Sequence, residues 1–338
     1  MNLRAARLAR PRLSLAFLIL LLLIASCRRS TTGTLAFVSN ERDGTITVID
    51  TATDKVVQTI TVGGRARGLR VSHDGKTVYV ALSTQPGKVR KPDDDRIAAI
   101  DIASGRVVAS YNVGSDPEKF DLSLDGKRLY ISNEDAGTAS VTDLASNQVI
   151  ATQVVGLEPE GVTISPDGRW VYVTSESSST VAVMDANTNQ VVKTFLVGAR
   201  PRDMAFSPDG SRAYVSAENG GTVSVVDVAT HTVIGTIELP REGEMKPMGV
   251  CVSPDGRRVF VATGRGHSLA VIDAADDKLL NMIPVGKRPW GVAVTPDGKK
   301  VYTANGLSND ISVVDTASNK VIATIKAGDG PWGIAIRP

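Results

Sequence analysis

The chain has 338 residues, of which 42% are hydrophobic, with 38 lysines and arginines against 36 aspartates and glutamates. The first 26 residues hold four of the arginines and no acidic residue, so the rest of the chain carries 34 basic and 36 acidic residues. This balance excludes a protein that binds nucleic acid through its overall charge, and nucleic acid is not an expected partner. Two cysteines, Cys27 and Cys251, exclude a disulfide-rich scaffold.

The N-terminus has the pattern of an export signal. Four arginines precede an apolar run from Leu15 to Ala25, which is too short to span a bilayer because a spanning helix needs about 20 residues. Ile24-Ala25-Ser26-Cys27 resembles the bacterial lipobox, which implies cleavage before Cys27 and lipidation of that residue. Arg28 follows where an inner-membrane retention signal has aspartate, so the resemblance implies an outer-membrane anchor facing the periplasm. An ordinary signal peptide with an incidental cysteine is the alternative.

We therefore divide the chain into residues 1–26 as signal peptide, 27–33 as lipidated cysteine and tether, and 34–338 as the folded part. Within the folded part an aspartate closes an apolar strand seven times, with a common spacing of 42 residues: Asp50, Asp101, Asp143, Asp185, Asp227, Asp273 and Asp315. A period of about 40–50 residues with strand signals alone is typical of a β-propeller. The sequence predicts an all-β, seven-bladed propeller.

Residues 290–328 show how one unit folds. Four strand patterns, 290–295, 300–305, 311–315 and 320–326, are joined by turns, among them Pro296-Asp297-Gly298. These predict a four-stranded antiparallel blade, and the repeated aspartate is expected to accept backbone N–H groups of the turn after it. The chain begins with a second strand at 35–40 and ends with a first strand at 332–338, so the C-terminal strand should complete the N-terminal blade.

Tyr172-Val173-Thr174-Ser175 and Tyr130-Ile131-Ser132-Asn133, with the repeated Val-Gly-x-x-Pro and Ser-Pro-Asp-Gly elements, resemble the YVTN family of β-propeller repeats. The seven-unit length, the opening Phe37-Val38-Ser39-Asn40-Glu41 and the export signal look closest to the β-propeller subgroup associated with pyrroloquinoline-quinone (PQQ)-dependent alcohol catabolism. That resemblance implies an accessory role beside a PQQ-linked oxidation and transport system. Related propellers include lactonases, haem and copper enzymes, and a periplasmic branch described as DNA-binding.

Functional residues should lie where the seven copies differ, because residues common to all copies serve the scaffold. In each Val-Gly-x-x-Pro-x-Gly segment, the side chain of the residue immediately before the last glycine position should face the mouth of the central channel. The residues there, which we call the mouth residues, are Trp332, Arg67, Glu118, Glu160, Arg202, Met248 and Trp290. Ring closure makes Trp290 and Trp332 neighbours, while acidic residues around Glu118 and Glu160 and arginines around Arg202 are expected to form separate sectors.

Loops and insertions are expected on the same face. Loops between second and third strands carry Glu41, Glu134, Glu176 and Glu218 at matching positions, then Arg265 and His267. The insertions are residues 85–96 and 239–246. We expect this face to bind a protein partner, or to hold a planar or anionic ligand such as PQQ between Trp290, Trp332, Arg67 and Arg288. Mutual neutralisation of rim glutamates and arginines is the alternative.

No motif for catalysis, a metal or a resident cofactor appears. The three histidines and two cysteines form no cluster with metal-ligand spacing, and no nucleophile elbow or phosphate-binding loop occurs. Cys251 is predicted to be a small core residue, and Asp93-Asp94-Asp95 a solvated loop. The function predicted is a non-enzymatic exported lipoprotein that acts as a binding scaffold. The alternatives are a propeller enzyme using channel-mouth carboxylates, either a lactonase-like hydrolase or a cofactor-dependent oxidoreductase, and a DNA-binding periplasmic propeller.

Overall fold

The structure, a computed structural model, describes residues 34–91, 93–240 and 242–337. The predicted signal peptide, Cys27 and the tether lie outside the described residues. Among the described residues no helix has the length and apolar character needed to cross a membrane. Apart from one turn of 3₁₀-helix, η1 (Gly264–Gly266), all regular elements in the described part of the chain are strands.

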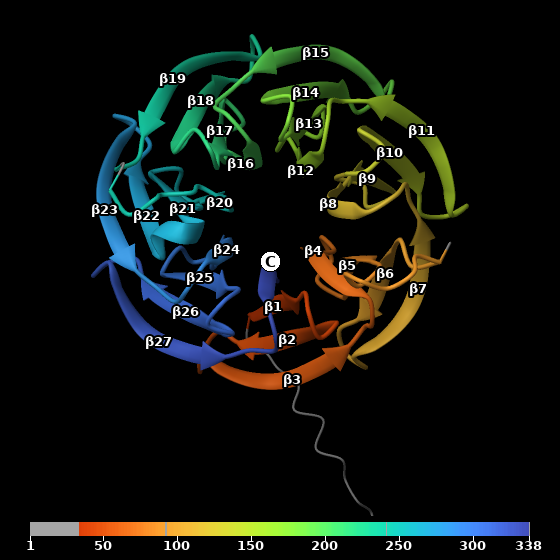
Figure 1. Cartoon of the computed structure of the whole chain (residues 1–338), viewed down its shortest axis with the longest axis horizontal. Coiled ribbons are helices and arrows are strands. Elements are labelled where there is room, and N and C mark those ends of the chain that lie inside the picture. The colour runs from red at the N-terminus through yellow and green to blue at the C-terminus, as the bar shows by residue number, and fades with distance from the viewer. Residues whose placement is uncertain (1–33, 92, 241, 338) are drawn as a thin grey trace, which may run out of the picture. The chain divides into compact units, whose positions relative to one another are not determined.

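Twenty-eight strands form seven four-stranded antiparallel sheets arranged as the blades of a ring (Figure 1), which confirms the predicted seven-bladed propeller. The innermost strands are β28 (Pro331–Ile336), β4 (Arg65–Val71), β8 (Pro117–Leu122), β12 (Pro159–Ile164), β16 (Pro201–Phe206), β20 (Val250–Val252) and β24 (Pro289–Val294). The second strands are β1 (Leu35–Asn40), β5 (Thr77–Ser83), β9 (Arg128–Asn133), β13 (Trp170–Ser175), β17 (Arg212–Ala217), β21 (Arg258–Ala262) and β25 (Lys300–Asn305).

The third strands all end at the repeated aspartate. They are β2 (Thr45–Asp50), β6 (Arg96–Asp101), β10 (Thr138–Asp143), β14 (Thr180–Asp185), β18 (Thr222–Asp227), β22 (Ser268–Asp273) and β26 (Asp310–Asp315). The outermost strands are β3 (Lys55–Thr61), β7 (Arg106–Asn112), β11 (Gln148–Val154), β15 (Gln190–Leu196), β19 (Thr232–Glu238), β23 (Lys278–Pro284) and β27 (Lys320–Lys326).

The C-terminal strand closes the ring. β28 pairs with β1 in antiparallel register, with Ala36 opposite Ile336 and Val38 opposite Ile334, so the first blade is assembled from both ends of the chain. This is the closure that the sequence predicts from its out-of-phase ends. As a result β1 has a hydrogen-bonded neighbour along both of its edges.

Each repeated aspartate holds the turn after its strand. In all seven copies a carboxylate oxygen accepts a backbone N–H two or three residues further on, at 2.7–2.8 Å. After Asp143 and Asp227 the hydroxyl of Ser146 or Thr230 donates to the same carboxylate oxygen, and the hydroxyl and backbone bonds together lower the pKa of the carboxyl group because they favour its charged form. The predicted structural role of the aspartate is confirmed.

The apolar core lies between neighbouring blades. Tyr130, Tyr172, Tyr214 and Tyr302 stand at matching places in four second strands and are fully buried. Tyr172 packs edge-on against Phe206 of the next blade, with ring centroids 5.0 Å apart. The blades are therefore held together by side chains that interlock between sheets, in addition to the chain connections.

The inner strands approach so closely that the position after the mouth residue has room for glycine alone in five blades. A Cβ added to Gly333 would stand 2.5 Å from the carbonyl oxygen of Arg67 in the next blade, and one added to Gly291 would stand 2.5 Å from that of Trp332. Serine hydroxyls tie the same carbonyls across blades, as Ser39 Oγ does by donating to Arg67 O at 2.5 Å. The repeated glycine thus sets the diameter of the ring centre.

Gly333→Ala should lower the free energy of unfolding by about 1–3 kcal/mol, because the added methyl group forces the first two blades apart. Gly235→Ala is the matched control, since a Cβ there meets Val225 only at an ordinary 3.7 Å. Urea unfolding measures both. Equal stability of the two variants would contradict this account of the ring centre.

Candidate functional site

The seven mouth residues stand at the start of the innermost strands, where they fill the end of the channel. Six of them are 1–7% exposed, and Trp290 alone is partly exposed. Met248 packs in the same apolar cluster as Trp290. The predicted binding mouth is therefore closed by its own side chains, and the groups available to a ligand lie on the loops around it.

Two ion-pair clusters replace the predicted separate acidic and basic sectors. In the first, the Arg67 cluster, Arg67 pairs with Glu118, with Glu41 at 3.2 Å and with Glu134 at 3.5 Å. Arg65 also contacts Glu41, at 2.6 Å. The prediction of sectors was wrong because a buried charge needs an opposite charge beside it. Arg67 accordingly turns toward carboxylates, although the sequence analysis placed it beside the tryptophans.

The second group, the Arg202 cluster, has the same construction three blades further round. Arg202 pairs with Glu160 at 3.2 Å and with Glu176, and Arg200 contacts Glu176 at 2.7 Å and Glu218 at 3.0 Å. The loop glutamates at matching positions in the repeats thus accept from the arginines of the inner strands. Mutual neutralisation, the alternative in the sequence analysis, describes most of these charges.

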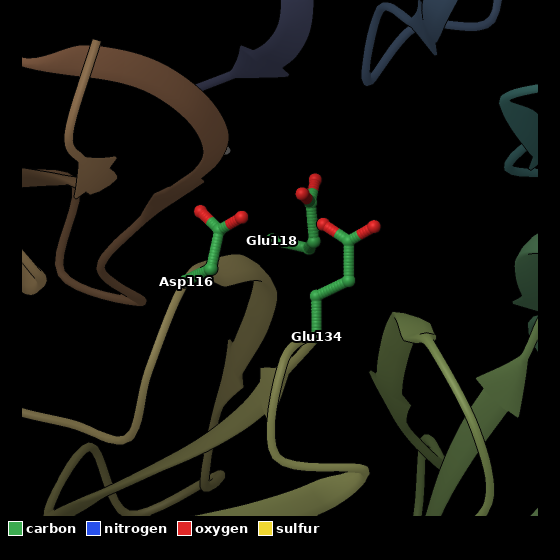
Figure 2. Close-up of side chains that lie close together, drawn as sticks. All are labelled: Asp116, Glu118 and Glu134. Carbon is green, nitrogen blue, oxygen red and sulfur yellow. The ribbon is translucent and has the colours of Figure 1, made fainter. Parts of the chain in front are cut away.

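Three carboxyl groups of the Arg67 cluster lie together. Figure 2 shows Asp116 and Glu118 on one segment and Glu134 reaching toward them from the loop between β9 and β10. One oxygen of each lies within 4.8 Å of the others. Such oxygens suit a hard cation, but the guanidinium groups of Arg65 and Arg67 already neutralise them.

Glu134 stands out among these carboxyl groups. Its pKa is raised from the ordinary 4.5 to about 7, chiefly by burial and also by the charges of Glu160 and Asp116, which Arg65 and Arg202 offset in part. Its side chain remains 29% exposed. Near neutral pH this group exists in both protonation states and is open to solvent, as a general base requires.

The predicted tryptophan pair is present. The rings of Trp290 and Trp332 stack with centroids 6.2 Å apart and an interplanar angle of 24°. The Arg288 guanidinium lies 4.8 Å from the centre of the Trp290 ring and that of Arg202 lies 5.3 Å from it, while Lys119 stands 5.4 Å from that of Trp332. Each of the two tryptophan rings therefore has at least one cation beside it.

Arg288 differs from the other mouth arginines. No described residue forms an ion pair with its guanidinium, and its backbone N–H donates to His267 Nδ1 at 3.0 Å. Burial lowers the pKa of Arg288, and Arg265 and Arg202 nearby lower it further, although Glu218 acts against them. A guanidinium that is half-buried, close to other cations and without a carboxylate is suited to bind an anion.

Four charged residues below the mouth were missed by the sequence analysis. Lys119 Nζ pairs with Asp203 at 2.9 Å, and Arg70 Nε donates to Asp121 at 3.0 Å. They occupy inner-strand positions where most blades have glycine or a small residue. Comparing the copies one and three positions beyond the mouth residue would have found them.

The other sequence-predicted features are held by local contacts. In the first insertion Asp95 pairs with Arg90, and Asp94 accepts from Thr84 and from the backbone of Lys91, which ties the acidic run to its own loop. In the second, Lys246 donates to Asn219. Cys251 is half-buried and lines the channel, and burial with the nearby Asp203 raises the pKa of its thiol, which therefore stays protonated.

Two protein-family models match the chain. Residues 23–200, just over half of it, match the Choice-of-anchor I domain.

The chain belongs to the choice-of-anchor I domain family.

Residues 190–325 match the family described as lactonase, 7-bladed beta-propeller, so the later blades of this choice-of-anchor I protein are also similar to lactonases.

Solved structures share the fold at low identity. Hydrazine synthase of Kuenenia stuttgartiensis is 23% identical, with a TM-score of 0.74 over 85% of this chain and 94% of that one. A provisionally assigned 6-phosphogluconolactonase of Bacteroides fragilis is 20% identical, with a TM-score of 0.74 over 91% and 99%. A functionally unknown protein of Desulfotomaculum acetoxidans is 18% identical, with a TM-score of 0.75 over 90% and 99%. No curated protein matches the chain. At these identities the structures establish the propeller fold alone.

The raised pKa of Glu134 has a consequence for stability. Its carboxyl group holds a proton more tightly in the folded protein than in the unfolded chain, so its contribution is most favourable below about pH 4.5 and is lost as the pH rises to about 7. Glu134→Gln does not titrate and should gain stability relative to the wild type between pH 5 and pH 8. Unfolding free energies at the two pH values measure this, with the exposed Glu244→Gln as control. If the difference in unfolding free energy between Glu134→Gln and the wild type were the same at both pH values, the raised pKa of Glu134 would be contradicted.

Proposed function

We propose that the chain is a hydrolase of the lactonase kind, acting on a small anionic lactone at the charged end of the channel. The observation that carries the proposal is Glu134, a solvent-accessible carboxyl group with a pKa of about 7 beside two arginines. The similarity of residues 190–325 to lactonases supports it. Two provisionally assigned 6-phosphogluconolactonases share the propeller fold, which is compatible with the proposal. At 20% and 19% identity they support the fold and not the reaction.

In the proposed reaction Glu134, deprotonated, accepts a proton from a water molecule that attacks the lactone carbonyl carbon. The negative charge that develops on the carbonyl oxygen is stabilised by Arg65, whose side chain is 26% exposed and lies in the same cluster. The ester C–O bond of the ring then breaks, and the departing alkoxide receives the proton held by Glu134. Water is consumed, one hydroxy acid forms, and Glu134 is again deprotonated.

Arg288 and Trp290 are proposed to bind the rest of the substrate. The unpaired guanidinium over the indole offers an anion site with a flat apolar surface beside it. A phosphate or carboxylate group on the lactone would bind Arg288, which explains why this arginine has no carboxylate partner of its own among the described residues.

Hydrolysis of 6-phosphoglucono-δ-lactone and of glucono-δ-lactone, above the spontaneous rate, tests the proposal. Glu134→Gln should lower kcat/KM by about 10²–10⁴-fold, and the wild-type kcat/KM should rise with pH around a midpoint near 7, because the base must be deprotonated. Arg288→Gln should raise KM for the phosphorylated lactone more than for the plain one. No turnover of either lactone, or full activity of Glu134→Gln, would refute the assignment.

A binding scaffold without catalysis is the second candidate, favoured by the pairing of most mouth carboxylates with arginines and by the stacked tryptophans. In this form the protein belongs to the PQQ-associated YVTN subgroup and holds PQQ or a periplasmic protein partner at the mouth. Export, lipidation of Cys27 and an outer-membrane anchor facing the periplasm are part of the same proposal. Metabolic labelling with a fatty acid, lost in Cys27→Ala, tests the anchor.

For the scaffold, Trp290→Ala should abolish PQQ binding measured by equilibrium dialysis, since the stacking surface and the seat of Arg288 are lost together. Trp170→Phe changes a tryptophan that packs on His231, away from the mouth, and should bind as the wild type does. Equal binding by both variants would remove the tryptophan pair from the proposal. Binding of PQQ together with no lactone turnover would favour the scaffold over the hydrolase.

A further inference from the structure

A cavity of about 400 Å³ lies in the channel below the mouth residues. This volume is within the range of about 300–1,000 Å³ common for small-molecule sites. Its lining runs from Trp290 and Trp332 down to Ile164 and Pro166 at the far end of β12. Pro166 is exposed, whereas six of the seven mouth residues are buried, so the cavity opens on the face opposite the predicted mouth.

Lys119 and Asp203 form the ceiling of this cavity. Lys119 projects from the third blade, contacts Trp332 of the first and pairs with Asp203 of the fifth. In the other five blades this position is glycine, and a Cβ there would meet backbone of the next blade at 2.5–2.9 Å. The scaffold thus closes without any side chain at this position, and charged residues in it are not needed for the fold.

Arg70 provides a second charged group on the same wall. Asp121 and two backbone carbonyls hold its guanidinium, which uses three of its five N–H groups and leaves two. Burial lowers the pKa of Arg70, but Asp121 and Asp203 outweigh it, so Arg70 stays charged. Asp203 Oδ2 is bound to Lys119 and to the Val250 N–H, and its other oxygen forms no hydrogen bond or ion pair with the described residues.

The opposite wall is apolar. It is built by the sixth, seventh and first blades from Val250, Cys251, Ala293, Val294 and Ile334. A ligand that fills the cavity therefore meets cationic donors and a carboxylate on one side and a small apolar surface on the other. The ion pairs beside the cavity lose hydration and contribute no apolar packing, so they are costly for stability. Such a cost is expected where charged groups recognise a ligand.

We propose that this cavity binds a small zwitterion with an apolar body, the chemistry of an apolar α-amino acid. The ligand carboxylate bonds the free N–H groups of Arg70 and Lys119, and its ammonium group bonds the open oxygen of Asp203. The side chain of the ligand packs on the wall around Ala293. This site lies below the proposed catalytic end of the channel, with Trp290 bordering both, and it does not depend on lactone hydrolysis.

Isothermal titration of the purified protein with L-leucine, 4-methylpentanoate and 3-methylbutylamine tests the proposal, because the last two lack the ammonium and the carboxylate group respectively. L-leucine should bind about tenfold or more tightly than either analogue. Equal binding of the carboxylate would make the site a plain anion site and overturn the zwitterion. No binding of L-leucine, and none of L-phenylalanine or L-valine in the same assay, would overturn the site.

The repeat provides a matched variant. Lys119→Gly with Asp203→Gly restores the glycine of the other five blades, so the ring should keep its unfolding temperature while L-leucine affinity falls about tenfold or more. Asp203→Gly alone leaves Lys119 beside Arg70, so preference should move to 4-methylpentanoate. If the glycine variants fail to fold, Ala293→Phe fills the cavity from the apolar wall and should abolish binding with both ion pairs in place.

Glu134→Gln serves as the control that separates the two ends of the channel. It should bind L-leucine as the wild type does, even though the proposed lactone hydrolysis is lost. A wild-type protein that hydrolyses no lactone yet binds L-leucine would refute the hydrolase and leave this site standing. Loss of L-leucine binding in Glu134→Gln would contradict a separate lower site.

Discussion

The close approach of seven inner strands at the ring centre is the constraint on which the rest of the structure depends. A glycine Cα faces the carbonyl oxygen of the next mouth residue in five blades, at a separation that excludes a Cβ. Serines from the second strands also donate to carbonyl oxygens of mouth residues in the next blade, as Ser132 does to Glu160 at 2.6 Å. These contacts are made by the backbone and by short side chains. They therefore fix the backbone position of every mouth residue without restricting which side chain it carries.

That geometry explains why the charges at the mouth pair. Seven long side chains that start from so narrow a ring exclude water from one another, and an unpaired charge in such a place costs several kcal/mol. Arg67 and Arg202 are each surrounded by glutamates from their own layer and from the loops above. The exceptions are informative for the same reason. Glu134 has a pKa near neutral, and Arg288 has no carboxylate partner among the residues that the structure describes; both are partly exposed to water.

The architecture could be predicted from the sequence because the same local strand and turn signals occur in each of the seven repeats. Strand periodicity, the turn after Asp143 or Asp315, and the out-of-phase ends at Leu35 and Trp332 each depend on neighbours along the chain or on the ring rule. The neighbouring tryptophans followed from closure. Pairing at the mouth did not follow, because whether Arg67 turns to Trp332 or to Glu118 is decided by rotamers and by desolvation, neither of which has a sequence period. Lys119 and Asp203 were missed because the comparison of copies stopped at the mouth residue.

The two ends of the channel differ because different residues of one inner strand face them. In β8, Glu118 serves the mouth and Lys119 the cavity below it, and in β16 the same is true of Arg202 and Asp203. Adjacent residues of one strand thus supply an upper ion-pair layer and a lower ceiling, with Lys119 under the Trp332 ring marking the boundary. The layer above is rich in carboxylates that hold arginines in place. The space below has fewer charges, an apolar wall and an open end, and there the inner strands leave a cavity of about 400 Å³ that a small molecule can fill.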